Sequence, residues 1–132
     1  MNRFHLFSAV LATLFLSTNA HAQVPVSTFQ NTCSNIHFSY QGNDAAINAV
    51  CLRADGTPNA TSILIPGIGN DNGKLVQTGG ASSFQQSCGN IQILVDGPDV
   101  TLYALCRTVR GNSLETSIPI LGIDNNNGNL TN

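Results

Sequence analysis

The sequence predicts an all-β protein built from two tandem copies of one small unit. Three observations carry this prediction. Shifting the chain by 55 residues aligns residues 28–77 with residues 83–132 without a gap, and 20 of these 50 pairs are identical. In both copies apolar side chains alternate with polar or small ones, which is typical of half-buried strands. No stretch after residue 22 has a long 3.6-residue apolar period, so we expect no substantial helix.

The N-terminal segment has the features of an export signal. It has a basic residue at Arg3, an apolar run over residues 6–16 and a small-residue site at Ala20-His21-Ala22. The run is shorter than the ~20 residues that cross a bilayer, and no later stretch is long enough to span one. We therefore expect residues 1–22 to be a signal peptide and residues 23–132 to form one domain. That domain would be secreted, or periplasmic in a bacterium, where disulfides are permitted.

Each unit is expected to contain three strands followed by a hairpin. The alternating segments cover residues 36–40, 47–51 and 61–65 in the first unit, and 91–95, 102–106 and 116–120 in the second. Gly, Asn, Asp and Pro at 41–44 and 96–99 are typical of turns between the first two strands.

The hairpins that close the units cover residues 68–75 and 123–130. Asn72-Gly73 and Asn127-Gly128 can take the positive φ angles of a type I′ turn. Residues 78–82, which contain two glycines, are expected to link the units. A unit of about 50 residues is too small to bury a competent core alone, so the two units must share one.

Four cysteines allow three pairings, between which spacing alone does not choose. Duplication favours a bridge inside each unit, Cys33 with Cys51 and Cys88 with Cys106, because the ancestral unit would have carried its own. Each bridge closes a loop of 19 residues and would contribute about 3 kcal/mol in the loop-entropy model. Zinc held by four thiolates is the alternative, but the chain has no C-x-x-C pair to support it.

Composition after residue 22 narrows the classes of function. Four basic residues stand against seven acidic ones, which gives a formal net charge of −3 and disfavours binding to nucleic acid. This part of the chain has a single His, His37, a single Glu, Glu115, and no Trp. Most acid–base, triad and zinc chemistries therefore lack their components. We expect no enzyme, no cofactor and no metal site.

Four motifs recur at the fixed period. Residues 29–35 and 84–90 follow the pattern F-x-x-[ST]-C-x-N, and residues 68–75 and 123–130 follow I-x-N-x-[DN]-G-x-L. With a second Cys on the next strand and a T-S-I strand, they resemble the cyanovirin-N homologue (CVNH) family of lectins over nearly the whole chain after residue 22. The resemblance implies a pseudo-symmetric fold in which the three-stranded sheet of one unit packs with the hairpin of the other.

The resemblance also implies two sugar sites that bind mannose-rich glycans or glycoproteins through hydrogen bonds. Each site would gather the segment before the first Cys of one unit, the segment after its second Cys, and the hairpin turn of the other unit. By position, one site would contain Asn70, Asp71, Asn72, Gln86, Ser87, Arg107 and Thr108, and we call it the Arg107 site. The other would contain Asn31, Thr32, Arg53, Asn125, Asn126 and Asn127, and we call it the Arg53 site.

Departures from the family pattern favour the Arg107 site. Leu52 and Ala54 stand where the best-known lectins of the family place polar contacts, which weakens the Arg53 site. At the Arg107 site Gln86 replaces a carboxylate and Val109 an arginine, while Arg107 keeps a planar donor fork. The 18-residue step from each first Cys to its second is longer than in the archetype, and we expect it to lengthen the loops at 40–46 and 95–101.

Alternatives remain beside a lectin. Asn and Gly in the hairpins could serve only to turn the chain, which would leave a secreted structural or protein-binding module without sugar sites. A glycosidase needs two carboxyl groups about 5 Å or about 6.5–9.5 Å apart, whereas the acidic residues here are scattered. The sequence also leaves open a monomer or a domain-swapped dimer, and whether Asn59 and Asn129 are glycosylated.

Overall fold

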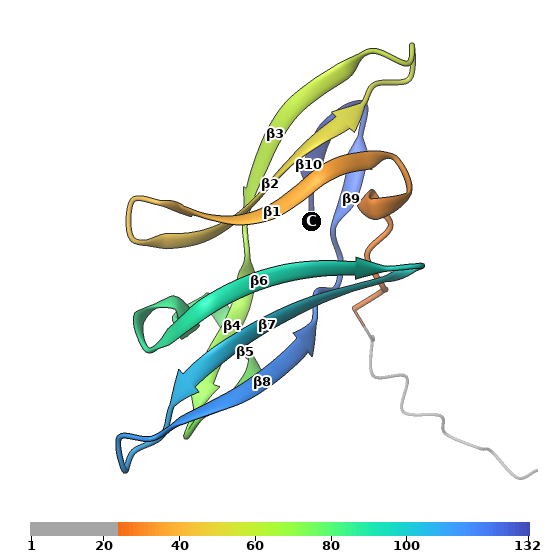
Figure 1. Ribbon diagram of the computed structural model, residues 1–132. Helices are drawn as coiled ribbons and strands as arrows, with labels where there is room; N and C mark the ends of the chain where they lie inside the picture. The colour runs from red at the N-terminus through yellow and green to blue at the C-terminus, as the bar shows by residue number, and fades with distance from the viewer. Residues whose placement is uncertain (1–23) are drawn as a thin grey trace, which may run out of the picture.

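Residues 24–132, which the computed structural model describes, fold almost entirely into antiparallel strands (Figure 1). The predicted signal peptide lies outside the described residues. Among residues 24–132, no helix is long and apolar enough to cross a membrane. The all-β prediction is confirmed.

Each unit contains a short 3-10 helix, a three-stranded sheet and a hairpin, as the repeat predicted. The first unit consists of η1 (Phe29–Asn31), β1 (Cys33–Gln41), β2 (Asp44–Leu52), β3 (Pro58–Leu64), β4 (Pro66–Asp71) and β5 (Lys74–Ala81). The second unit consists of η2 (Phe84–Gln86), β6 (Cys88–Asp96), β7 (Asp99–Arg107), β8 (Ser113–Pro119), β9 (Asp124–Asn126) and β10 (Asn129–Thr131). The sheets have the order β1-β2-β3 and β6-β7-β8, and the hairpins are β4-β5 and β9-β10.

The hairpins are exchanged between the units. β5 of the first unit lies against β8 of the second, and β10 of the second lies against β3 of the first (Figure 1). At each junction a threonine hydroxyl accepts a hydrogen bond from a backbone N–H of the hairpin: Leu75 N to Thr116 Oγ1 at 3.0 Å, and Leu130 N to Thr61 Oγ1 at 3.1 Å. This confirms the predicted packing of one unit's sheet with the other unit's hairpin.

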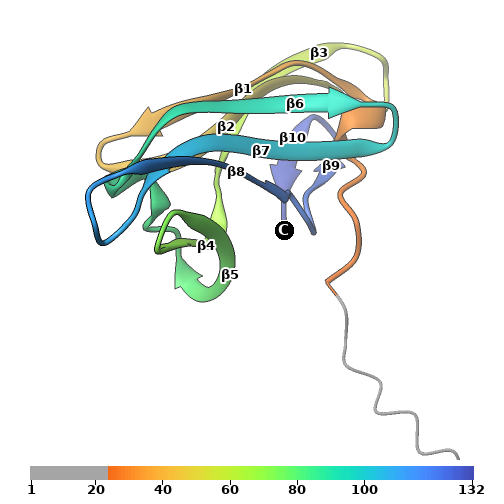
Figure 2. The same ribbon diagram turned by 60° about the horizontal axis from the view of Figure 1, so that its bottom comes forward.

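One core serves both units, because β1 and β6 lie side by side (Figure 2) and bring the two sheets together. Equivalent side chains are buried in each half. Phe29 and Phe84 of the 3-10 helices are fully buried, as are Ile47 on β2 and Leu102 on β7. All four belong to one apolar cluster, which supplies the hydrophobic driving force that a single unit lacks.

Both disulfides form inside the units, as duplication predicted. Cys33 bonds to Cys51, and Cys88 bonds to Cys106. In each pair the two residues face each other directly across neighbouring strands. The zinc alternative is excluded, because all four cysteines are oxidised in this way.

Two predictions about the connections are wrong. The long Cys-to-Cys step lengthens the strands rather than the loops, since β1 and β2 pair as far as Gln41 and Asp44 and leave a two-residue turn. Residues 78–82 are not a free linker, because β5 extends to Ala81, which pairs with Pro66. In both places strand pairing extends further than the apolar pattern does, although the register shifts between Pro66 and Ile68, opposite residues 78–80.

The type I′ turn prediction is confirmed. Asn72 and Gly73 have φ angles of 50° and 89°, and Asn127 and Gly128 have the same pair of values. Positive φ at both central residues matches the twist of the flanking strands, which fixes the register of each hairpin.

Replacing Gly67 by alanine should destabilise the fold. Gly67 has a φ of +56°, and a Cβ there would lie 2.2 Å from the carbonyl oxygen of Thr78 on the paired strand. We expect the free energy of unfolding to fall by at least about 2 kcal/mol, measured by chemical denaturation. Gly79→Ala is the matched control, because nothing lies within 4 Å of its Cβ. Equal effects of the two substitutions would contradict this account.

Reducing the two disulfides should unfold the protein at moderate temperature. Each bridge contributes about 3 kcal/mol in the loop-entropy model, and the sum is comparable with the whole stability of a small domain. Thermal unfolding with and without reductant, with thiol titration to verify reduction, measures this. An unchanged midpoint in fully reduced protein would show that the strands alone hold the fold.

Candidate functional site

Asn70 ties the β4–β5 hairpin to the second unit at the Arg107 site. Its Nδ2 donates to Ser87 Oγ at 2.9 Å and to the carbonyl oxygen of Arg107 at 3.0 Å. Its Oδ1 accepts a hydrogen bond from Gly73 N at 2.8 Å across the turn. Three partners thus fix this half-buried amide, and the hairpin turn meets the segments before the first Cys and after the second Cys, as the resemblance implied.

Asn125 makes the equivalent contacts at the Arg53 site. Its Nδ2 donates to Thr32 Oγ1 at 2.8 Å and to the carbonyl oxygen of Leu52 at 2.9 Å. Its Oδ1 accepts from Gly128 N at 2.7 Å. The two junctions therefore use the same hydrogen bonds at positions 55 residues apart.

A second asparagine in each turn holds the loop after the second Cys. Asn72 Oδ1 accepts a hydrogen bond from Val109 N, and Asn127 Oδ1 accepts one from Ala54 N, both at 2.9 Å. These four turn asparagines were expected to bind sugar. Asn70 and Asn125 are engaged through both amide atoms and shape the junctions. Within residues 24–132 only the Oδ1 atoms of Asn72 and Asn127 have partners, so their Nδ2 groups can still donate to a ligand.

The two arginines differ in what they bind. The Arg53 guanidinium donates to Thr57 Oγ1 at 3.2 Å, to the carbonyl oxygen of Pro58 at 3.0 Å and to Asn59 Oδ1 at 2.8 Å. Within residues 24–132, the exposed Arg107 guanidinium makes no side-chain hydrogen bond. Arg107 alone therefore offers its full donor fork to a ligand.

Repeat position explains this difference. In the 55-residue alignment Arg107 corresponds to Leu52, and Arg53 corresponds to Thr108. Arg53 thus stands one residue further along its loop, where its side chain reaches the loop itself. The next acidic group on that loop, Asp55, is held ionised, because hydrogen bonds from the hydroxyl and the backbone N–H of Thr57, together with the charge of Arg53, lower its pKa.

Three residues of the Arg107 site line one hollow of about 380 Å³. They are Gln86, Ser87 and Arg107. The remaining wall comes from Cys88, Gly89, Asn90, Leu105 and Ser113. Asn70, Asp71, Asn72 and Thr108 do not line it, so the seven predicted residues do not form a single pocket. Asn70 and Asn72 reach the second unit through their hydrogen bonds instead.

Sequence reasoning missed part of this wall. Ser113 lies beside Arg107 because the two are paired across β7 and β8, and Asn90 takes a φ of 48° beside an irregularity in the pairing of β6 and β7. Asn90 closes the motif at residues 84–90, but neither Asn90 nor Ser113 was among the predicted site residues. The Asn35/Asn90 match between the repeats was the available signal.

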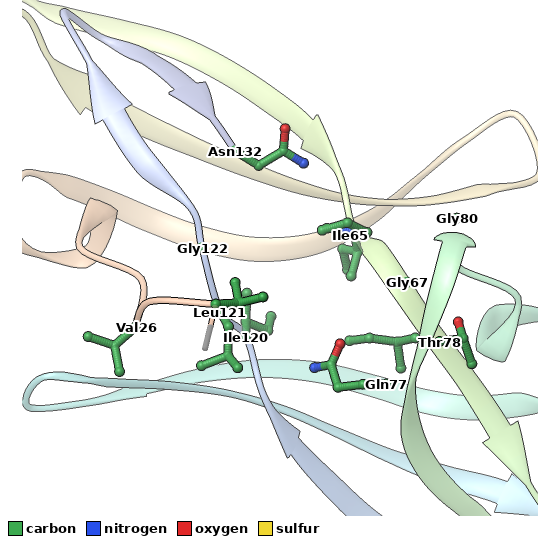
Figure 3. Close-up of a pocket in the computed structure, with 13 residues that line it drawn as sticks. Val26, Ile65, Gly67, Gln77, Thr78, Gly80, Ile120, Leu121, Gly122 and Asn132 are labelled. Carbon is green, nitrogen blue, oxygen red and sulfur yellow. The ribbon is translucent and has the colours of Figure 1, made fainter. Parts of the chain in front are cut away.

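A larger hollow, of about 800 Å³, lies where the chain crosses between the units (Figure 3). Its wall includes Ile65 and Ile68 from the first unit and Ile120 and Leu121 from the second. None of the predicted sugar-site residues contributes to it. Its lining is mainly apolar, with Gln77, Thr78 and Asn132 as its polar side chains, and it offers no charged donor, so we place the candidate site at Arg107.

The structure shows no cluster of side chains that could hold a metal ion in the part of the chain it describes. No three His, Cys, Asp or Glu side chains gather within residues 24–132. His37 lies exposed on β1, with its Nδ1 2.8 Å from the carbonyl oxygen of Asn35. His37 is thus a surface residue of a strand.

Comparisons with known proteins agree on one family. The model described as the CVNH domain matches residues 29–131. The structure is similar to that of a microvirin:mannobiose complex, with 31% sequence identity, coverage of 81% of this chain and 97% of that chain, and a TM-score of 0.60. The T. borchii CVNH structure has 25% sequence identity, coverage of 79% of this chain and 97% of that chain, and a TM-score of 0.62. A MoCVNH3 variant in complex with (N-GlcNAc)4 shares the fold. It has 21% sequence identity, coverage of 80% of this chain and 96% of that chain, and a TM-score of 0.58. No curated protein matches the sequence.

Removing the Asn70 side chain should destabilise the protein, whereas removing its neighbour's should not. Asn70→Ala deletes three hydrogen bonds at the junction, and we expect a loss of about 1–3 kcal/mol in the free energy of unfolding. Asp71→Ala changes an exposed turn residue, and its effect should stay within about 0.5 kcal/mol. Denaturant unfolding compares the two. If Asn70→Ala were as stable as Asp71→Ala, these hydrogen bonds would not hold the junction.

Proposed function

The chain belongs to the CVNH family, and from that premise we propose that it is a carbohydrate-binding lectin that recognises mannose-rich oligosaccharides mainly at the Arg107 site. The observation that carries this proposal is the unengaged Arg107 guanidinium beside Gln86 and Ser87 in one hollow. Its volume of about 380 Å³ lies at the small end of the range of about 300–1,000 Å³ typical of ligand pockets.

The chemistry of the hollow suits a neutral sugar. Adjacent sugar hydroxyls both donate and accept hydrogen bonds. Arg107 supplies donors in a planar fork, the exposed Gln86 amide supplies a donor and an acceptor, and Ser87 supplies a hydroxyl that already accepts from Asn70. The carboxylate of Asp71, exposed at the tip of the hairpin, adds an acceptor at the edge of the site.

The Arg53 site is the weaker candidate. Its arginine donates to three protein oxygens, and the residue that corresponds to Arg107 is Leu52, which is exposed and apolar. A sugar at this end would find the exposed Asn31 and Asn126 side chains and the Nδ2 group of Asn127, but no free guanidinium. We therefore propose that one site dominates binding.

Mannose as the sugar is supported by the likeness to microvirin, whose structure was solved with mannobiose. The signal peptide predicted at residues 1–22 supports the same function, since an exported lectin would meet glycans on cell surfaces and secreted glycoproteins. We propose no catalysis and no cofactor. Monomer and domain-swapped dimer would keep the same junctions, because each junction joins segments of different units.

The competing proposal is a structural or protein-binding module that lacks sugar binding. Its support is that the amide groups of Asn70 and Asn125 donate their hydrogen bonds to the protein itself. A glycan array with mannose competition separates the two functions. Binding to mannose-rich glycans that free mannose displaces supports the lectin, and an array without signal supports the module.

Arg107→Ala should weaken oligomannose binding by roughly one to two decades. The substitution removes charge-assisted hydrogen bonds of about 1.5–3 kcal/mol. Titration calorimetry measures the affinity. Arg110→Ala, which removes the same charge from an exposed position three residues later, is the control and should bind as the parent does. Unchanged binding by Arg107→Ala, together with loss of binding in Arg53→Ala, would move the site to the other end.

A further inference from the structure

A second polar hollow adjoins the Arg107 site. It has a volume of about 360 Å³ and is lined by Tyr40, Gly42, Asn43, Gln85 and Gln86. The first three residues belong to the β1–β2 hairpin of the first unit, and the last two belong to η2 of the second. Gln86 also lines the hollow that contains Arg107. The two hollows therefore meet at one side chain.

The Tyr40 ring is held in a fixed position. Its ring centroid lies 5.0 Å from that of Phe38 in an edge-to-face arrangement, and the Phe38 centroid lies 6.3 Å from that of Phe84. Phe84 is fully buried in the core, whereas Tyr40 is 56% exposed. Three aromatic rings thus connect the core to the surface beside η2, and the outer ring is already ordered before any ligand arrives, which reduces the entropy lost on binding.

Gln85 joins the walls of this hollow. It is 8% exposed, and its Nε2 donates to the carbonyl oxygens of Asn43 at 3.2 Å and Ser82 at 3.0 Å. Its Oε1 is buried and has no partner within residues 24–132. A buried acceptor without a donor is unfavourable, because it has lost its hydrogen bonds to water. A water molecule or a ligand hydroxyl is the kind of group that would relieve this cost.

The equivalent place in the other half lacks the ring. The 55-residue alignment matches Tyr40 with Val95 and Asn43 with Pro98, while Gln85 matches Gln30. Gln30 makes the same kind of clamp, donating from Nε2 to the carbonyl oxygens of Ser27 and Pro98, and its Oε1 also lacks a partner. The glutamine clamp is thus part of the scaffold. The exposed Tyr40 ring and the Asn43 amide, in contrast, have no equivalent at the matching positions of the second unit.

We infer that Tyr40, Asn43 and Gln86 form an extension subsite for a further neutral hexopyranose unit of the glycan held at the Arg107 site. Every residue that lines the hollow is uncharged, which disfavours an acidic sugar. The Tyr40 ring offers a flat apolar surface to one face of the pyranose, and the amides of Asn43 and Gln86 offer donors and acceptors to its hydroxyls. The inference rests on the proposed function, since the first sugar must bind beside Arg107.

The test compares a short and a long ligand in the full chain. We expect Tyr40→Ala to weaken binding of a branched oligomannose by roughly two- to twelvefold, the range that corresponds to an aromatic contact of about 0.5–1.5 kcal/mol. Binding of mannobiose should stay unchanged, because it occupies the Arg107 hollow alone. Tyr40→Phe should keep most of the affinity for the long ligand. Val95→Ala, at the matched position of the other half, should affect neither ligand.

Tyrosine fluorescence gives a second readout that does not depend on affinity. The chain has two tyrosines and no Trp, so in a Tyr103→Phe variant the emission comes from Tyr40. We expect this emission to change when the branched oligomannose is added and to stay constant when mannobiose is added. A change with both ligands, or with neither while both bind, would overturn the subsite.

The remaining outcomes separate the two proposals. If Tyr40→Ala binds the long ligand as the parent does, or loses both ligands equally, the proposed extension subsite is wrong. The Arg107 site is then judged separately, from the binding of the Arg107→Ala and Arg53→Ala variants. If the parent binds neither ligand, the proposed function fails and the subsite fails with it. Thermal unfolding of each variant verifies that it is folded.

Discussion

Reciprocal docking of the two hairpins is the constraint on which the rest of this structure depends. At each junction one asparagine, Asn70 or Asn125, bonds to its own turn, to a hydroxyl before a cysteine and to a carbonyl after the next cysteine of the other unit. Each such hydrogen bond contributes only about 0.5–1.5 kcal/mol net. Their importance lies in geometry, because they join segments that an isolated unit cannot supply and so position the candidate sites together with the shared core.

The symmetric scaffold carries an asymmetric surface. Residues that build the junctions, turns and disulfides match across the two units, since both halves must fold in the same way. Residues that face outward next to them do not match: Leu52 corresponds to Arg107 and Tyr40 to Val95. A surface position that the fold does not depend on can change without loss of stability. Positions at which the two repeats differ therefore indicate binding residues more directly than positions at which they are identical.

The repeat period, the strand alternation and the Asn-Gly turns were readable from the sequence, and the matching family model confirms the resemblance drawn from the motifs. Two connections were misjudged. The apolar pattern ends before the strands do, because Gln41 pairs with Asp44 and Ala81 pairs with Pro66 beyond the last apolar positions. Side-chain pattern reports which residues are buried, whereas strand length depends on whether a neighbouring backbone is available.

The sequence by itself determined the all-β fold and the duplication, because side-chain periodicity and the repeat are local features of the chain. It favoured one cysteine pairing through the duplication, and the structure shows that pairing. Tertiary structure alone decided which polar groups remain free. Arg53 and Arg107 look alike in sequence, yet the first donates to three oxygens of its own loop and the second to none within residues 24–132. Likewise, Tyr40 and Gln86 meet only because distant segments pack together. A hydrogen bond depends on a separation of about 3 Å, and only the folded chain fixes that distance between residues far apart in sequence.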